Sequence, residues 1–480
     1  MKPQQRSSLT EVQVGALPLE LLARLLEPER AARLEAYAEA ARGLLGDRVV
    51  WNINATASGG GVAEMLLALL AYARGAGVDA RWLVLNGDPD FFRTTKRLHN
   101  FLHGSLGDEG DLGEREQQHY EAVLAANLEG LTELISPGDL VLLHDPQTAG
   151  LVTGIRELGA HVVWRAHIGA DMSSRVTEAG WSFLRPYVSA AEAVIFSRAE
   201  FVPRWVDPGR VVVIPPSLDP FSPKNRELGP DEVEATLRAA GIVDGDADEA
   251  HLDFARRDGS QARVRQHKGV VMGGGMAPDV RYVLQVSRWD RLKDMAGVVT
   301  GFAAALDSMP EDVHLVVAGP RPEGVSDDPE GAEVSEECLV TWLELPDRAR
   351  RRIHLCNVPT DDVDENAHIV NALQRRADLV VQKSVAEGFG LTVTEPMWKA
   401  RAVLASRVGG IQDQIVHGES GVLLDDPRDL AGFGRAVTTL MRDDGLRARL
   451  GAAARERVRD QYLGDRHLIQ YVDLFASLLG

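Results

Sequence analysis

The sequence predicts an α/β fold made of two doubly wound parallel-sheet domains. Short β-branched runs alternate with helical stretches along the chain, which is the pattern of parallel strands joined by crossover helices. The alternation comes in two sets, and a segment rich in proline, glycine and acidic residues separates them after Pro216. The length of 480 residues fits roughly two to three domains, each with its own core.

Six runs in each half of the chain are expected as strands. The first set lies at 49–54, 80–85, 140–144, 161–165, 193–197 and 211–215. The second set lies at 282–287, 314–319, 353–358, 379–382, 403–406 and 422–424. Leucine and alanine at helical spacing predict one or two helices at 17–45, ahead of the first strand, and further helices at 430–480.

Domain limits follow from these two sets. We expect a Rossmann-like N-terminal domain at 1–215, which includes the leading helices, and a Rossmann-like C-terminal domain at 281–455. Residues 216–280 have too few periodic apolar positions for a core of their own, so they are expected as a connecting excursion. The last helix, 456–480, is expected to pack back on the N-terminal domain.

Composition and charge narrow the class of function. The chain carries 52 Lys and Arg against 71 Asp and Glu, a formal net charge of −19, which argues against a nucleic-acid partner. The longest apolar run, 65–73, is far shorter than the ~20 residues that cross a bilayer, which argues against a membrane protein. No apolar segment of a secretory signal follows Met1, so a cytoplasmic protein is expected.

A glycine-rich loop follows the first predicted strand and opens the next helix. Gly59, Gly60 and Gly61 allow a ligand to approach the backbone closely. The unpaired N–H groups of a helix start favour an anion such as a diphosphate. The loop matches neither the GxGxxG nor the Walker A pattern, and a tight strand-to-helix turn is the alternative interpretation of this motif alone.

Two cations follow the first strand of the second set. Arg288 and Lys293 lie at the carboxyl end of that strand, where open α/β sheets bind ligands. Five residues apart, they can clamp one pyrophosphate between them. A solvated charged loop is the alternative explanation for the same residues.

Two glutamates separated by seven residues, Glu387 and Glu395, flank a glycine-containing turn. Gly388 and Gly390 permit an anion-holding turn, and Pro396 suits the first turn of a helix, so Glu395 is expected at a helix start. A carboxylate at that place can accept hydrogen bonds from both hydroxyls of a ribose. Paired carboxylates also occur in glycoside hydrolases, but hydrolases need no pyrophosphate clamp, so transfer from an activated sugar is favoured.

These three motifs together resemble the retaining glycosyltransferases of family 4, which have the GT-B fold. Longer stretches resemble the trehalose glycosyltransferring synthases within that family. These stretches lie at 54–64, 91–100, 144–147, 163–168, 214–220, 257–259 and 286–290. The similarity runs from about residue 45 to the C-terminus.

The resemblance implies the GT-B fold, in which two Rossmann-like doubly wound domains face each other across a cleft, an acceptor domain first and a nucleotide-sugar domain second. It implies a nucleotide-diphosphoglucose donor, ADP-, UDP- or GDP-glucose, whose glucose passes with retention to the anomeric hydroxyl of glucose. The product that the resemblance implies is α,α-trehalose, formed in a reversible reaction. The expected partners are small sugars and the nucleotide sugar, with no nucleic acid and no membrane.

The resemblance also assigns residues to roles. His167 matches the histidine beside the donor sugar, and we expect it to position the sugar and stabilise charge rather than to act as a general base. The expected catalytic residues are Arg288 and Lys293 on the pyrophosphate, with Glu387 and His167 at the donor sugar. The expected donor-binding residues are Gly59, Gly60, Gly61, Gly388, Phe389, Gly390, Leu391 and Glu395, the last on the ribose.

Three residues are candidates for contacts with the acceptor: Asn54, His99 and Asp145. Asp145 follows His144 at the end of a strand in the half expected to bind the acceptor, so its carboxylate can bind sugar hydroxyls. His99 lies in an amphipathic helix, and a packed or surface histidine is the alternative there. Gly169 stands where the subfamily has an acidic residue, so nearby acceptor contacts depart from the family pattern.

Two other functions remain open at this point. A trehalose phosphorylase of the same superfamily would use orthophosphate as leaving group, and a catalytically silent regulator would bind the nucleotide sugar without turnover. Glu395 favours a nucleotide donor, because a carboxylate that holds ribose has no purpose without one. No obligatory cofactor and no metal site on the protein are expected, whereas a Mg²⁺ requirement, the donor base, the direction in the cell and a homodimer are left open.

Overall fold

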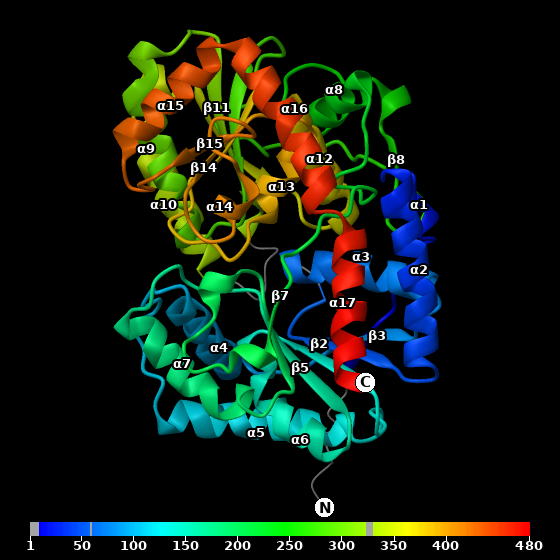
Figure 1. Cartoon of the computed structure of the whole chain (residues 1–480). Coiled ribbons are helices and arrows are strands. Elements are labelled where there is room, and N and C mark those ends of the chain that lie inside the picture. The colour runs from blue at the N-terminus through cyan, green and yellow to red at the C-terminus, as the bar shows by residue number, and fades with distance from the viewer. Residues whose placement is uncertain (1–8, 58–59, 323–329) are drawn as a thin grey trace, which may run out of the picture. The chain divides into compact units, whose positions relative to one another are not determined.

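The computed structural model describes residues 9–57, 60–322 and 330–480, and its residue contacts divide the chain into two compact units (Figure 1). Unit 1 consists of Met1–Ser217, Glu387–Phe389 and Tyr462–Gly480. Unit 2 consists of Leu218–Ala386 and Gly390–Gln461. The predicted N-terminal domain and the predicted last helix thus fall in the same unit, and the unit changes at residues 217 and 461 rather than at 215 and 455.

Unit 1 is built on a sheet that has seven strands in the described part of the chain, in the order β1-β3-β2-β4-β5-β6-β7. β1 pairs with β3 in antiparallel register, and the other neighbouring pairs are parallel. β2 and β4 are buried along their whole length, as strands covered on both faces must be. The strands are β1 (Thr10–Val12), β2 (Val50–Asn54), β3 (Ala80–Val84), β4 (Leu140–His144), β5 (His161–Ala166), β6 (Ala193–Phe196) and β7 (Val211–Val213).

Helices cover both faces of this sheet. On one face the apolar side chains pack with α4 (Pro89–Leu102), α5 (Glu114–Leu131), α6 (Val152–Glu157) and α7 (Arg175–Val188). On the other face they pack with α2 (Pro28–Leu45), α3 (Gly61–Gly75) and α17 (Gly464–Leu479), and α1 (Glu20–Ala23) lies beside α2. Figure 1 shows α17, in red, running alongside α2 and α3. Because successive strand side chains alternate between faces, Asn52, His144 and Arg165 point to the α17 side.

Unit 2 contains a parallel sheet that has six strands among the described residues, in the order β12-β11-β10-β13-β14-β15. The strands are β10 (Arg281–Val286), β11 (Val313–Pro320), β12 (Ile353–Val358), β13 (Leu379–Gln382), β14 (Val403–Ser406) and β15 (Val422–Leu424). Its helices are α8 (Pro230–Ala239), α9 (Met295–Ala305), α10 (Gly331–Leu343), α11 (Asp347–Arg350), α12 (Val363–Arg376), α13 (Leu391–Trp398), α14 (Ile411–Gln414), α15 (Leu430–Arg442) and α16 (Asp444–Gln461).

The segment expected as a connecting excursion is part of unit 2 instead. It contains α8 and a small antiparallel hairpin of β8 (Asp253–Ala255) and β9 (Gln261–Arg263). Its apolar residues are sparse, but Val233, Leu237 and Val270 join α12 in covering one face of the unit 2 sheet. The segment therefore needs no core of its own, because it completes the core of its neighbour.

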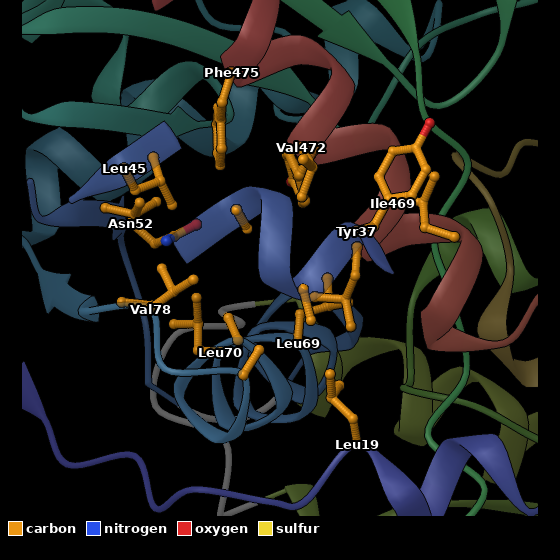
Figure 2. A pocket seen from close by; sticks show the side chains of 18 of the residues that line it. Leu19, Tyr37, Leu45, Asn52, Leu69, Leu70, Val78, Ile469, Val472 and Phe475 are labelled. Atoms are coloured by element: carbon orange, nitrogen blue, oxygen red, sulfur yellow. The ribbon is translucent and has the colours of Figure 1, made fainter. Parts of the chain in front are cut away.

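An apolar pocket of about 80 Å³ lies in unit 1 between the sheet and helices α2, α3 and α17 (Figure 2). Leu45, Leu70, Ile469 and Phe475 are among the side chains that line it. Asn52 is a polar exception in this lining. The pocket marks incomplete packing where three helices meet the strand that carries Asn52.

Filling this pocket is expected to stabilise unit 1. Ala41 lines the pocket from α2, and replacing it by leucine adds three heavy atoms to empty space. We expect the free energy of unfolding to rise by about 1 kcal/mol, measured by urea denaturation, because cavity volume in a core is destabilising by ~24 cal/mol per Å³. Ala36→Leu, on the exposed side of the same helix, is the control and should leave stability nearly unchanged. A loss of stability in Ala41→Leu would mean that the pocket cannot accept the side chain.

None of the helices within the described ranges is long and apolar enough to span a membrane.

Candidate active site

Polar side chains line the carboxyl ends of neighbouring strands in unit 1. Asn52 lies on β2, His144 ends β4, and His167 follows β5. The Nδ1 atom of His144 lies 3.0 Å from Nε2 of His167, and the Nε2 atom of His144 lies 3.1 Å from Oδ1 of Asn52. The two imidazole rings are nearly parallel, with centroids 5.3 Å apart. The three side chains thus form a hydrogen-bonded row from the pocket lining to His167.

Asp145 follows His144 and has an unusual backbone conformation. Its φ of 63° and ψ of 176° lie in a region that L residues other than glycine rarely adopt, at a cost of about 1–3 kcal/mol. The backbone N–H of His167 donates to its carboxylate at 2.8 Å, and the indole N–H of Trp164 donates to its carbonyl at 3.1 Å. These bonds hold the strained residue beside His167, and such strain is typical of functional sites.

A buried cation lies behind the histidines. The guanidinium of Arg165 donates to Nε2 of His467 at 2.8 Å, to the carbonyl of Ile214 at 2.9 Å and to the hydroxyl of Tyr471. No carboxylate of the described residues lies within ion-pair distance of it. Burial, with a smaller contribution from Arg165, lowers the pKa of His144 to about 3 and places that of His167 well below its usual value. Both imidazoles are therefore neutral at neutral pH.

The Glu387–Phe389 segment lies against this row of residues. A Cβ atom on Gly388 would come within 2.4 Å of the carbonyl oxygen of His167, so glycine is required for the contact. The ring of Phe389 packs on that of Tyr462, with centroids 5.6 Å apart. His167 and the Glu387 segment belong to separate motifs in the sequence, and the structure brings them together in unit 1. The side chain of Glu387 is half-buried.

The remaining unit 1 candidates have different surroundings. Asn54 accepts a hydrogen bond from the indole N–H of Trp82 at 2.8 Å and donates to the carbonyl of Thr56 at 2.8 Å, so its amide anchors the loop after β2. Gly60 is the N-cap of α3 and Gly61 its first residue, and a Cβ atom on Gly60 would face open space. Gly59 lies outside the described residues. His99 is half-buried on α4, with its ring 4.8 Å from that of His103.

In unit 2, Arg288 and Lys293 occupy a tightly anchored loop after β10. The side-chain amide of Gln285 donates to the carbonyl of Lys293 at 2.8 Å, and the indole N–H of Trp289 donates to the carbonyl of Pro320 at 2.8 Å. An ion pair between the buried Lys383 and Asp294 closes the end of the loop. The two cations are half-buried on a loop whose backbone is fixed from three sides, which suits a preorganised anion clamp.

Glu395 lies inside a helix, and the expectation that it marks a helix start is wrong. Helix α13 begins at Leu391 with Gly390 as its N-cap, and Pro396 is an interior residue of the helix. Gly390 has a φ of 89°, which glycine adopts without strain, and the helix starts directly after it, about one helical turn earlier than predicted. Pro396 was a misleading signal, because its missing N–H is tolerated within this short helix.

The carboxylate of Glu395 is buried and held by two partners. The amide of Gln374 donates to Oε2 at 2.9 Å, and the ammonium of Lys224 lies 3.6 Å from Oε1. Lys399 donates to Oε1 of Gln374 at 2.7 Å, and burial lowers the pKa of Lys399 to about 7. The network fixes the orientation of the carboxylate before any ligand binds.

Sequence reasoning missed the residues that support the site. The site candidates did not include Asn52, Gln374 or Lys399, because each belongs to an ordinary strand or helix pattern. Strand alternation could have indicated Asn52, since a buried amide at a core-facing position needs a polar neighbour. Gln374 and Lys399 come from distant segments, and nothing in their local sequence predicts their contact.

The ionisation of Asp145 is expected to make stability depend on pH. Burial raises the pKa of Asp145 to about 7, although the His167 N–H and Arg165 oppose this effect. Between about pH 4 and about pH 7 the folded state therefore binds more protons than the unfolded chain, and stability falls as the pH rises through this window.

Asp145→Asn removes this titration while keeping a side chain that tolerates positive φ. The quantity to compare is the free energy of unfolding of the variant minus that of the unmodified protein. We expect this difference to be larger at about pH 8 than at about pH 4.5 by about 1 kcal/mol or more, because only the unmodified protein loses stability as Asp145 ionises. Urea denaturation at several pH values measures it. A difference that is the same at every pH would contradict the raised pKa.

Within the described residues, no group of three His, Cys, Asp or Glu side chains is arranged to hold a metal ion. Unit 1 instead brings together neutral imidazoles and the carboxyl group of Asp145, which suit contacts with a sugar. Unit 2 carries anchored cations and the buried carboxylate of Glu395, and cations of this kind suit a diphosphate and the charge that develops on it as it departs.

The fold has clear counterparts among known proteins. Residues 274–457 match the family model described as Glycosyl transferases group 1. The solved structure of an α,α-trehalose-phosphate synthase (UDP-forming) from Burkholderia vietnamiensis superposes with a TM-score of 0.65 at 16% identity, covering 90% of this chain and 97% of that one. The chain is a glycosyltransferase with the GT-B fold, and the predicted fold class is confirmed.

Sequence relatives narrow the family further. Residues 52–203 match the model described as Trehalose synthase, N-terminal domain. The trehalose synthase of Pyrococcus horikoshii is 33% identical over 470 residues, covering 98% of this chain and 99% of the relative. The trehalose phosphorylase of Pleurotus pulmonarius is 26% identical and covers 85% of this chain and 54% of the relative. The chain belongs to the trehalose synthase family, and the resemblance stated from its motifs is confirmed.

Proposed function

We propose that this protein transfers glucose, with retention, from a nucleotide-diphosphoglucose to the anomeric hydroxyl of free glucose, forming α,α-trehalose reversibly. The observation that carries the proposal is the position of the Glu387 segment against a neutral, hydrogen-bonded His167, in a chain of the trehalose synthase family. The trehalose synthase from P. horikoshii matches the chain along almost its whole length, which supports the same reaction for both.

The reaction exchanges one bond at the anomeric carbon for another. The bond from C1 of glucose to the diphosphate oxygen breaks, and a bond from C1 to the acceptor oxygen forms on the same face. The acceptor proton passes to the departing phosphate oxygen, so the products are trehalose and a nucleoside diphosphate. Arg288 and Lys293 stabilise the negative charge that develops on the diphosphate. No side-chain nucleophile is needed.

The environment of His167 supports a positioning role. An imidazole with a pKa well below its usual value is a weak base, so His167 is poorly suited to remove the acceptor proton. A neutral imidazole instead offers one donor and one acceptor to sugar hydroxyls. Asp145, held beside it through the His167 N–H, is the candidate for contacts with the acceptor sugar.

Glu395 supports a nucleotide donor. Its carboxylate is oriented by Gln374 and Lys224 before binding, and we assign it to the ribose hydroxyls. We include Gly60, Gly61, Gly388, Phe389, Gly390 and Leu391 in the donor site because the motifs that carry them resemble those of the family, and Gly59 is included on the same resemblance. A Mg²⁺ ion, if required, would come with the diphosphate of the donor.

A trehalose phosphorylase activity is the second candidate, because the P. pulmonarius relative carries that name. The reverse reaction, in which trehalose is broken down, distinguishes a nucleotide-dependent synthase from a phosphorylase. Trehalose is incubated either with ADP, UDP or GDP, or with inorganic phosphate, and the sugar product is identified. We expect nucleotide-diphosphoglucose to form with at least one diphosphate and glucose 1-phosphate not to form. Phosphate-dependent release of glucose 1-phosphate would refute the nucleotide donor, and tight donor binding without any turnover would indicate a silent regulator.

A further inference from the structure

The row of side chains in unit 1 has a definite hydrogen-bond direction. Oδ1 of Asn52 can only accept, so the Nε2 atom of His144, 3.1 Å away, must carry a proton and donate. A neutral imidazole has one protonated nitrogen, so Nδ1 of His144 accepts. Nε2 of His167, 3.0 Å from that atom, must then be the donor. Two successive bonds fix the proton position on the histidine at the end of the row.

We propose that Asn52 and His144 are positioning residues that hold His167 in the Nε2–H tautomer and leave the lone pair of its Nδ1 atom to accept a hydrogen bond from a hydroxyl of the donor sugar. The last step of this inference rests on the proposed function. The tautomer itself depends only on the hydrogen-bonded row, which can be tested without substrate.

The surroundings of the row favour a single neutral state. Asn52, His144 and His167 are all at least nine-tenths buried, so water competes little for their hydrogen bonds. Arg165, itself fully buried, disfavours a second positive charge on either imidazole. Among the described residues, Nδ1 of His167 has no hydrogen-bond partner, so this atom is available to a ligand.

Strand geometry explains why the row exists. Asn52 pairs with Leu142 across β2 and β4, and His144 pairs with Arg165 across β4 and β5. Asn52 and His144 therefore project from the same face of the sheet, two residues apart along the strands. His167 continues that alternation just beyond β5. On its other side Asn52 meets the apolar pocket of Figure 2, which supplies no competing charge.

Nitrogen NMR on the intact, ligand-free protein tests the tautomer directly. With ¹⁵N-labelled histidine, correlations from ring hydrogens to ring nitrogens distinguish protonated from unprotonated atoms, and the 13 histidines keep the spectrum simple. The signals of His167 are assigned by their loss in His167→Gln. We expect a protonated Nε2 and an unprotonated Nδ1 near neutral pH. The opposite tautomer, a mixture of both, or an imidazolium would overturn the proposal.

Variants of Asn52 test its role. Asn52→Asp retains the accepting oxygen and should keep the tautomer of His167, whereas Asn52→Leu removes the acceptor and should give a mixture. Asn127→Leu is the control, because Asn127 is another buried amide of unit 1 and bonds Asn86 and Val123 rather than a histidine. If Asn52→Leu does not fold, the spectrum of the unmodified protein still decides the tautomer.

Kinetics connect the tautomer to the donor sugar. Asn52→Leu is expected to raise the KM for the donor about tenfold. Asn52→Asp is expected to have a donor KM much closer to that of the unmodified protein. A changed tautomer with unchanged donor KM would overturn the link to the sugar. Absence of turnover in the unmodified protein would refute the proposed function and leave the tautomer result standing, so the two failures are distinguishable.

Discussion

Arg288→Ala is expected to lower kcat by about 10²–10³-fold, because a preorganised cation opposite a leaving group is worth most when the charge develops. Lys293→Ala should have a similar effect, since both residues lie on the loop that Gln285, Trp289 and Lys383 anchor. The donor KM should change much less than kcat. Initial rates with saturating glucose and varied donor measure both constants.

The same loop provides a matched control. Arg291 is exposed and forms ion pairs with Glu337 at 2.6 Å and Glu333 at 3.3 Å. Arg291→Ala removes an equal charge from the loop, and both constants should stay within about twofold, because exposed ion pairs contribute little. Equal losses in Arg288→Ala and Arg291→Ala would show that the loop needs charge in general, and full activity in Arg288→Ala would refute the clamp.

Glu395→Gln is expected to weaken donor binding by about tenfold or more, seen as a raised donor KM with a smaller change in kcat. The substitution keeps the shape of the side chain but replaces a carboxylate oxygen, which only accepts, by an amide that must donate. It also removes the negative charge that faces Lys224, so the free energy of unfolding should fall by about 1–3 kcal/mol.

The effect of Glu395→Gln on stability is distinguished from its effect on donor binding by measuring both quantities on the same variant. Urea denaturation gives the stability, and titration of the folded variant with the nucleoside diphosphate gives the affinity. Glu419→Gln, the same change at an exposed position of unit 2, should alter neither. A variant that is destabilised yet binds the diphosphate as tightly as the unmodified protein would limit Glu395 to a structural role.

Much of the fold could be predicted because its signals are local. Each predicted strand coincides with an observed strand to within two residues at either end, since buried parallel strands are short apolar runs between helices. The strand β1 escaped prediction because its three residues, Thr10–Val12, are not buried and include a single apolar side chain. The 216–280 segment was misjudged for another reason: its sparse apolar residues cover the sheet of unit 2 and need no core of their own.

Candidate site residues can be selected from the sequence only where neighbours in the chain carry the motif. Arg288 and Lys293 belong to one loop, and Glu387 to one short segment, so motif spacing selects them as candidates, and their roles stay predictions. The bonds from Asn52 to His144 and from Gln374 to Glu395 join distant segments, and only the folded chain brings them together. The strained backbone of Asp145 likewise has no local signal, because an aspartate after a strand is common in unstrained turns.

The most direct test of the proposed reaction follows one labelled carbon. Nucleotide-diphosphoglucose with ¹³C at C1 of its glucose is mixed with unlabelled glucose and the protein, without added phosphate, and the products are followed by NMR. We predict a non-reducing disaccharide with the label in an α-anomeric position and an equal amount of nucleoside diphosphate. A β-anomeric label, or no labelled disaccharide from the adenine, uracil or guanine donor, would contradict the account.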